Sequence, residues 1–234
     1  MVLVQLLAAL GLPIAQAQNF QNLGFERARV PVVPSGEFGH LVPVEEAIPG
    51  WSVWLGADPQ THILHNNFTL GAPSAVILGP QWPSQSIIEG SFTLRLRTGL
   101  GFPPAPDPGP GFAVDVSLLQ TGLIPLEAQS VRFKAEVFPR AAPITLRLDG
   151  QEVLLLAMET TQNRILFGGD VSAFAGRTAE LRLTAIASVL GPTDFRLDSF
   201  SFSSEPVPEP GALTLWMAGG ASLALWAWRR RTDP

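Results

Sequence analysis

The central part of the chain alternates strictly between apolar and charged side chains. In residues 131–137 (VRFKAEV), four apolar side chains share one face and Arg, Lys and Glu share the other. Successive side chains of a β-strand point to opposite faces, so this period of two predicts a strand with one buried and one solvated face. Strands of that kind belong to antiparallel sheets. The pattern therefore restricts the body of the chain to a largely antiparallel β fold.

The same alternation returns elsewhere in the body. Residues 144–148 (ITLRL) repeat it and run into Asp149-Gly150, a pair typical of tight hairpin turns, before a second apolar run at 153–156. Residues 92–97 and 181–183 are further examples. Several short strands of this kind indicate more than one hairpin.

A change of register is expected near the end of the body. Phe195 and Leu197 occupy odd positions, whereas Phe200 and Phe202 occupy even ones. A regular strand would place these two pairs on opposite faces. A β-bulge around Asp198-Ser199 keeps all four side chains on one face, and we predict a bulge there.

Turn residues separate these strands. Helical periodicity is almost absent from the body, and a short turn at 171–176 is the one candidate. The stretch 99–111 contains five prolines and is expected to be a surface loop. Many short strands without a βαβ rhythm predict an all-β fold, a jelly-roll-like β-sandwich.

Composition excludes some classes of function. The chain has 234 residues, room for one domain of ordinary size plus targeting segments. Its net charge is −5 and no basic stripe with interleaved aromatics occurs, so we expect no nucleic-acid partner. Because cysteine is absent, disulfides, thiolate nucleophiles and cysteine metal clusters are excluded.

The N-terminus has the pattern of a secretory signal. An apolar stretch covers 2–14, and Ala15-Gln16-Ala17 supplies the small side chains that signal peptidase accepts. We expect a signal peptide at 1–17 with cleavage after Ala17. The alternative is a buried N-terminal helix, but Gly11 and Pro13 disfavour a helix in so short a run.

The C-terminus contains a candidate membrane span. Residues 212–228 carry no charge, and as a helix they would be about 26 Å long, slightly less than the hydrocarbon core of a bilayer. Arg229, Arg230 and Arg231 follow directly, and their charges resist translocation. We expect the body outside and the tail inside. The alternative is a core helix, although this run is apolar on all sides.

These C-terminal features together resemble a known sorting signal. Val207-Pro208-Glu209-Pro210, the apolar run and the terminal arginines are similar to the PEP-CTERM signal of exported bacterial proteins, which exosortase, a membrane transpeptidase-like enzyme, is thought to process. The resemblance implies that Pro208, Glu209 and Pro210 are recognised, that 212–228 spans the membrane and that Arg229, Arg230 and Arg231 stop transfer. The chain would be the substrate of the sorting enzyme.

The body carries a resemblance of its own. The opening NLGFE (22–26), the later segment FAGRTAELRL (174–183) and the closing RLDSFSF (196–202) are similar to ectodomains that accompany PEP-CTERM signals and look like carbohydrate-binding jelly rolls. The resemblance covers roughly 19–204. It implies a sandwich fold, and sandwich folds host many functions.

Three residues form the best metal candidate. Asp58, His62 and His65 lie within eight residues, and such ligands could meet around zinc. A strand would place positions 62 and 65 on opposite faces, and no fourth ligand is spaced nearby. We therefore interpret the histidines as solvated loop residues and expect no metal.

Carboxylates offer two further possibilities. Glu45-Glu46, Glu89 and Glu136 could serve glycoside hydrolysis. Glu136, however, lies on the polar face of an alternating strand, where it is expected to face water or pair with an arginine. Asp170, Asp194 and Asp198 could supply oxygen ligands to a structural calcium ion, although their spacing matches no EF-hand loop. We expect no catalytic residues and no cofactor.

Sugar binding would use exposed aromatic rings. Trp51, Trp54 and Trp82 are the tryptophans of the body. Trp51 and Trp54 would face opposite sides of a strand, so at least one is expected in the core. Trp82 lies between two prolines in a predicted loop and is the better candidate for ligand binding, with packing as the alternative.

The sequence thus predicts three parts: a signal peptide (1–17), a β-sandwich ectodomain (18–204) and a sorting segment (205–234). We expect a non-enzymatic protein that passes the inner membrane, is held there by one span and reaches the cell envelope or extracellular matrix. Its expected partners are an exosortase-type transpeptidase and the inner membrane. A surface module that binds extracellular polysaccharide and a glycan hydrolase are the alternatives.

Overall fold

The computed structural model describes residues 18–34, 37–82, 87–101, 111–138, 143–161, 163–188 and 191–208. The predicted signal peptide and the predicted span at 212–228 lie outside these ranges. Within the ranges, no helix has the length and apolar character needed to cross a membrane.

The described residues form an all-β body with two very short helices. The elements in chain order are β1 (Leu41–Pro43), α1 (Val44–Ala47), β2 (Ser52–Leu55), β3 (Asp58–Gln60), β4 (His62–His65), β5 (Ser74–Leu78), β6 (Thr93–Arg97), β7 (Gly99–Gly101), β8 (Phe112–Val114), β9 (Val116–Leu123), β10 (Ser130–Phe138), β11 (Ile144–Leu148), β12 (Gln151–Val153), β13 (Leu156–Thr160), β14 (Ile165–Asp170), the 3₁₀ helix η2 (Ser172–Phe174), β15 (Thr178–Ala185) and β16 (Asp194–Ser203).

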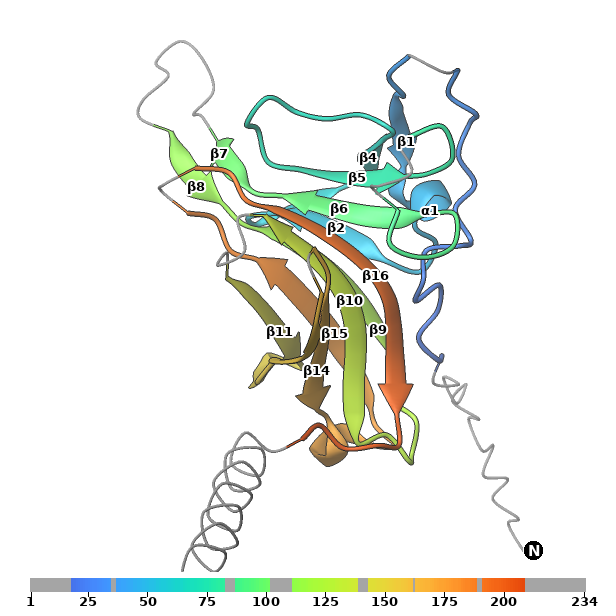
Figure 1. Cartoon of the computed structure of the whole chain (residues 1–234), viewed down its shortest axis with the longest axis vertical. Helices are drawn as coiled ribbons and strands as arrows, with labels where there is room; N and C mark the ends of the chain where they lie inside the picture. The colour runs from blue at the N-terminus through green and yellow to red at the C-terminus, as the bar shows by residue number, and fades with distance from the viewer. Residues whose placement is uncertain are drawn as a thin grey trace, which may run out of the picture.

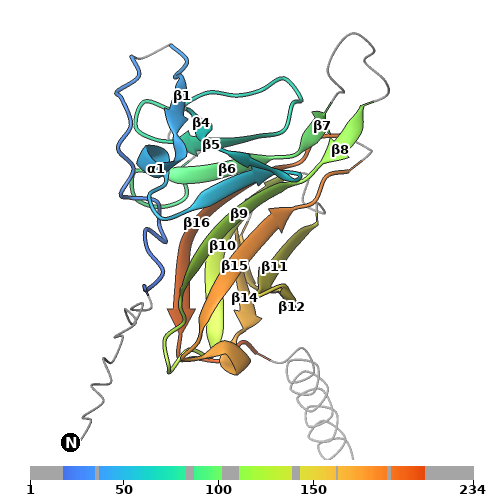
Figure 2. The same ribbon diagram turned by 180° about the vertical axis from the view of Figure 1, so that it is seen from behind.

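Two sheets pack face to face (Figure 1). The larger sheet has the order β1-β4-β5-β6-β16-β10-β14-β13, and the smaller has the order β12-β11-β15-β9-β2-β3. Figure 2, from behind, shows the smaller sheet in front, with β9, β15 and β11 running along it. The strands β7 and β8 form a separate two-stranded ribbon at the upper end of the molecule.

Eight of these strands follow a jelly-roll order. In chain order they are β6, β9, β10, β11, β12, β14, β15 and β16. Numbered one to eight, they lie as 1-8-3-6 in the larger sheet and as 2-7-4-5 in the smaller one. The first strand therefore neighbours the last, and the second neighbours the seventh, as in a rolled-up pair of Greek keys. The prediction of a jelly-roll-like β-sandwich is confirmed.

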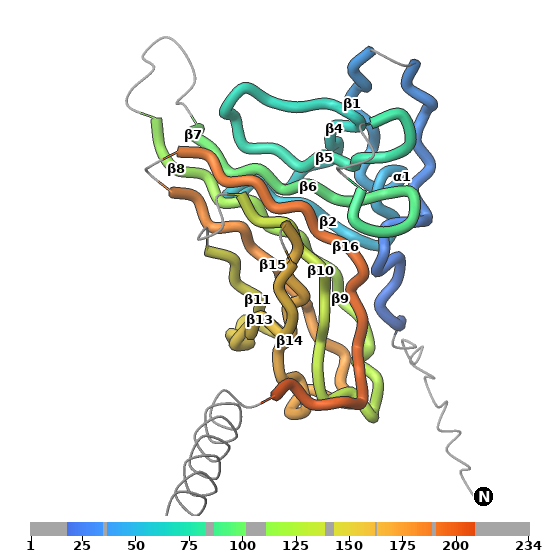
Figure 3. Tube along the Cα trace, in the orientation of Figure 1, coloured from blue at the N-terminus to red at the C-terminus, as the bar shows by residue number. Residues whose placement is uncertain are grey.

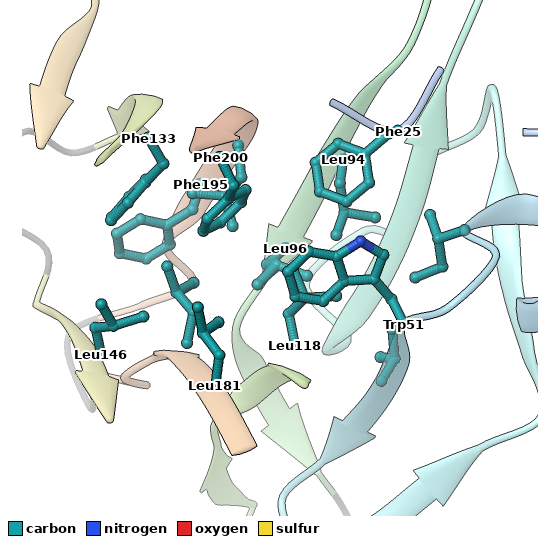
Figure 4. Packing of buried hydrophobic residues seen from close by; sticks show 14 of the residues in the cluster. Phe25, Trp51, Leu94, Leu96, Leu118, Phe133, Leu146, Leu181, Phe195 and Phe200 are labelled. Carbon is teal, nitrogen blue, oxygen red and sulfur yellow. The ribbon is translucent and has the colours of Figure 1, made fainter. Parts of the chain in front are cut away.

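The core lies between the sheets and is rich in aromatic rings. Figure 4 shows the side chains of both sheets meeting there. The ring of Phe200 stacks on Phe133 with centroids 5.0 Å apart and packs against Trp51 at 5.5 Å and Phe25 at 6.2 Å. These contacts join the N-terminal segment to both sheets. Because all four side chains are almost fully buried, the cluster contributes strongly to stability.

The predicted bulge lies where the sequence places it. Arg132 of β10 pairs with Ser201 of β16, whereas Lys134 pairs with Asp198, so β16 holds an extra residue between these pairs. Ser199 has φ of 54°, in the left-handed region. The bulge lets Phe195, Leu197 and Phe200 all face the core, which is the physical reason for it.

The predicted hairpin after 144–148 is also present. Asp149 and Gly150 both have positive φ, as a type I′ turn requires, and β11 pairs with β12. The return strand is shorter than the apolar run 153–156 suggested. β12 ends at Val153, and the chain crosses to the other sheet, where β13 begins at Leu156.

The loop prediction at 99–111 was wrong at its start. Residues 99–101 form β7 and pair with β8, whereas 102–110 lie outside the described residues. A side chain at Gly99 would come within 2.2 Å of the carbonyl oxygen of Gly71. The glycine thus permits a close backbone approach, which proline-rich composition did not reveal. The predicted turn at 171–176 is the short helix η2.

Candidate functional site

The last described residues cross the body instead of leaving it directly. β16 ends at Ser203, and the following residues reach Pro208. Figure 3 shows this segment turning at the end of β16 and running back across the lower end of the sandwich. It passes over β10 and then β14 of the larger sheet, because Glu205 contacts Arg132 of β10 and Val207 lies against Gly168 of β14.

Three residues hold the start of this segment, and we call Ser130, Arg132 and Glu205 the clasp. The Ser130 hydroxyl donates to the Glu205 carbonyl oxygen at 2.7 Å, and Arg132 Nη2 donates to the same oxygen at 3.2 Å. Arg132 Nη1 also donates to the Glu205 carboxylate at 3.1 Å. Arg132 Nε bonds to the Ser130 hydroxyl at 3.1 Å, which orients both donors.

Beyond the clasp, Val207 of the segment packs against Gly168 of β14. A Cβ at Gly168 would be 3.0 Å from Val207 Cγ1 and 2.3 Å from Met158 Sδ. Any larger residue at 168 would therefore push the segment or Met158 away. Val207 is half-buried, whereas Pro206 and Pro208 are exposed. This alternation is that of an extended chain with one side toward the sheet.

A pocket of about 350 Å³ opens beside the same segment. The segment supplies one wall through Val207 and Pro208, and the ends of β12, β13 and β14 together with η2 supply the others. The lining is mixed, because Leu154 and Phe174 are apolar whereas Glu152 and Asp170 are acidic. The segment is thus only partly packed against the body. The lining residues are Gln151, Glu152, Val153, Leu154, Leu156, Asp170, Ala173, Phe174, Val207 and Pro208.

The tryptophans divide between the core and the surface. Trp51 is buried, and its indole N–H donates to the Asn22 carbonyl oxygen at 3.0 Å, so the expectation of one core tryptophan is confirmed. Trp54 is half-buried on the outer face of the smaller sheet, with the Arg182 guanidinium 5.8 Å from its ring centroid. Trp82 is half-buried at the end of a described range, and its role in ligand binding stays a prediction.

The histidines were expected in a loop, and this was wrong. His62 and His65 both belong to β4, where His62 is exposed and His65 is buried. The strand places them on opposite faces. Burial lowers the pKa of His65, because the charged imidazolium would lose its hydration. Among the described residues, no group of three or more His, Cys, Asp or Glu side chains could hold a metal ion.

Among the described residues, two of the candidate carboxylates are paired with cations. Glu136 accepts from Arg164 at 3.1 Å and from Arg196 at 2.6 Å, which confirms the expected pairing with arginine. Glu89 accepts from Lys134 and from the Ser199 hydroxyl, and these hydrogen bonds lower its pKa. Ion pairs of this kind link neighbouring strands on the outer face of the larger sheet.

Asp198 stands apart from these pairs because its carboxylate is buried and no cation in the described part of the chain pairs with it. Its carboxylate accepts from the Thr93 hydroxyl at 2.8 Å, from the Ser199 amide at 2.7 Å and from the Glu89 amide at 3.2 Å. Burial nevertheless raises its pKa to about 6, and the nearby Glu26 charge adds to this shift. These two amide donors and one hydroxyl donor only partly offset the lost hydration of the carboxylate.

A calcium site formed by Asp170, Asp194 and Asp198 would require their three carboxylates to lie close together. Asp194 instead pairs with Arg95 at 2.7 Å, and Asp170 accepts from the Ser172 amide at 2.8 Å. The structure does not bring them together with Asp198, so these residues do not fit a calcium site.

The clasp of Ser130, Arg132 and Glu205 was not predicted from the sequence. The alternating pattern placed Arg132 on the polar face of its strand, but its partner Glu205 is 73 positions away. Gly168 carried no signal either, because its function is to leave space for Val207. A long-range pairing of this kind leaves no periodic trace in one sequence.

The described residues thus form a β-sandwich body that ends with β16 at Ser203, followed by the start of a C-terminal segment. Comparison with protein families identifies this segment: residues 206–231 match the PEP-CTERM protein-sorting motif. The match begins at Pro206, directly after the clasp. The chain therefore carries this sorting motif, which implies export through the membrane and sorting by exosortase.

Two further comparisons concern the whole chain. The comparison with curated proteins found no match. Among solved structures, the chain is similar to one described as "Structure of TmCBM61 in complex with beta-1,4-galactotriose", with 12% identity and a TM-score of 0.37. That similarity covers 81% of this chain and 100% of the other.

Proposed function

We propose that this protein is an exported component of the cell envelope or extracellular matrix whose C-terminus is anchored in the inner membrane and then cleaved. The observation that carries the proposal is the sorting motif at 206–231, which starts where the β-sandwich ends. The uncharged run at 212–228 is long enough for one span, and the arginines after it favour a body outside the cytoplasm.

The proposal assigns a part to each predicted segment. Residues 1–17 direct export, with Ala15 and Ala17 at the cleavage site, and 18–204 form the functional body. The exosortase-type transpeptidase recognises the motif Pro208-Glu209-Pro210. Two prolines fix φ and remove backbone donors, so the motif favours the extended form that a peptide groove accepts. Arg229, Arg230 and Arg231 hold the chain during transfer.

The body then acts as a structural or adhesive unit without enzymatic activity. Its two sheets enclose a continuous apolar core, and ion pairs link neighbouring strands of the larger sheet. Close packing of this core stabilises the body without disulfides.

Cell fractionation tests the proposal. In cells with the sorting enzyme, we expect the protein in the envelope or matrix fraction. In cells that lack the enzyme, and for a Glu209→Ala variant in normal cells, we expect the full chain in the inner-membrane fraction. Equal distribution in all three cases would refute sorting through this motif. An alanine substitution at half-buried Glu180, in the body, is the control for loss of one carboxylate.

A second candidate function is binding of extracellular polysaccharide. One observation favours it: on the outer face of the smaller sheet, Trp54 lies opposite Ser117, and Ser117 lies opposite Thr184. The two hydroxyl oxygens are 2.9 Å apart. Ser117 is only 5% exposed and the two hydroxyls bond to each other, so the half-buried Trp54 ring is the group on this face that offers stacking to a pyranose.

Glycan-array binding tests this second function. Binding that is lost in Trp54→Ala would place it on the sheet face, and binding lost in Trp82→Ala would place it at the predicted loop site. Wild-type protein that binds no glycan would refute it and favour a purely structural body.

A further inference from the structure

The start of the sorting motif is covered on one side by the body. Val207 lies against Gly168, and Pro208 forms part of a pocket wall. Just before them, Glu205 receives two hydrogen bonds on its carbonyl oxygen and one on its carboxylate. The first residues of the motif therefore cannot be enclosed by another protein while the clasp is closed.

An enzyme that cuts or transfers a peptide binds it in an extended form inside a groove. Grooves of this kind contact the backbone and alternate side chains of the peptide. The side of the segment that carries Val207 is turned toward β14, so a groove would collide with the sheet. Binding to the motif must then be preceded by release of the segment from the body.

We propose that the clasp of Ser130, Arg132 and Glu205 is a latch that sets how often the sorting enzyme can reach the motif. Arg132 is its positioning residue, because it holds both the carbonyl and the carboxylate of Glu205. This inference rests on the proposed function. The enzyme acts on the open fraction alone, so its apparent affinity falls in proportion to that fraction.

The latch can open without unfolding the sandwich. Glu205 is 76% exposed, and the contacts that hold it come from β10, which keeps its own ladder with β14 and β16. The pocket beside Val207 and Pro208 shows that packing under the segment is incomplete. Few buried contacts and an exposed pairing are the features of a segment that opens locally.

The first test weakens the latch. Arg132→Ala removes the hydrogen bonds that Arg132 makes to Ser130 and Glu205. We expect processing of the full chain to be about tenfold faster in cells that contain the sorting enzyme. Arg132→Lys keeps the positive charge but loses the forked geometry of the guanidinium. We therefore expect its processing rate to lie between those of the wild type and Arg132→Ala. Arg147→Ala is the matched control, because this arginine is exposed on the other sheet and its partner Glu152 is 4.0 Å away.

The second test locks the latch. The chain has no cysteine, so Gly168→Cys combined with Val207→Cys introduces one defined pair. A Cβ at 168 lies within disulfide reach of residue 207, and the flexible Met158 side chain can move aside. We expect the oxidised double variant to remain unprocessed and dithiothreitol to restore processing. The two single-cysteine variants show the effect of each substitution alone.

The outcomes separate the latch from the sorting proposal. Faster processing of Arg132→Ala at an unchanged unfolding midpoint, together with redox-dependent processing of the double variant, supports the latch. Equal rates for wild type, Arg132→Ala and the oxidised double variant would overturn the latch and leave sorting intact. A wild-type chain that is never processed would overturn both.

Discussion

Removal of the buried Asp198 charge should change how stability depends on pH. Asp198 is 1% exposed, and its pKa in the folded protein is raised from 3.8 to about 6. Between these values the folded state binds more protons than the unfolded state. The free energy of unfolding therefore falls as pH rises through this window, and the stabilising effect of protonation is complete below about pH 4.

The size of the effect follows from the shift. About two pKa units correspond to about 3 kcal/mol, a large fraction of the stability of a domain. Asp198→Asn removes the titrating group. Relative to wild type, the variant should therefore gain roughly 2–2.5 kcal/mol in unfolding free energy between pH 4 and pH 7, because part of the effect falls below pH 4. Other groups, including Glu89 with its lowered pKa, titrate in both proteins and cancel in this comparison.

Urea unfolding of the full chain in mild detergent measures this difference, with tryptophan fluorescence as the signal because Trp51 is buried. Midpoints and slopes at pH 4.0, 5.0, 6.0 and 7.0 give the two stability curves. Asp170→Asn, at an exposed carboxylate, is the control for the loss of one carboxylate. A difference between Asp198→Asn and wild type that stays constant over this range would show that the folded-state pKa is not raised.

Two further predictions concern packing and ion pairs. Phe200→Ala should lower the unfolding free energy by about 3–5 kcal/mol, because it empties the centre of the aromatic cluster; a loss below about 1 kcal/mol in urea unfolding would contradict the packing described. Glu136→Gln should lower the unfolding free energy by about 1 kcal/mol, because its arginine partners are partly exposed, and added salt should reduce this difference from wild type. Glu152→Gln, at a 4.0 Å pair, should lower it by almost nothing. Equal losses for both variants would be inconsistent with the observed geometry.

Local patterns predicted the regular parts of the fold. Strand β10 was predicted from its period of two, the turn at Asp149-Gly150 from its residue types, and the bulge near Ser199 from the shifted phenylalanines. Each of these signals lies within about ten residues of sequence. Because one face of each strand must be buried, the order of apolar and polar residues has to follow the strand and its bulge, and this order can be recognised in a single sequence.

The parts that could not be predicted depend on distant neighbours. His65 is buried because β4 pairs in parallel with β5, a contact that its own sequence does not encode. Gly99 belongs to a strand because it pairs with Val114 of β8, and its lack of a side chain leaves space for the backbone of Gly71. The clasp joins Arg132 to a glutamate 73 positions later, and neither residue type is unusual on a sheet surface. Such pairings follow from topology alone.

The intact mass of the mature protein tests the central claim most directly. The protein should be isolated from the envelope and matrix fractions of cells with and without the sorting enzyme. With the enzyme, we predict a chain that begins at Gln18 and has lost the residues beyond the Pro208-Glu209-Pro210 motif, including the arginine cluster. A mature chain that still ends at Pro234 in both cell types would contradict sorting by cleavage and leave a permanent membrane anchor.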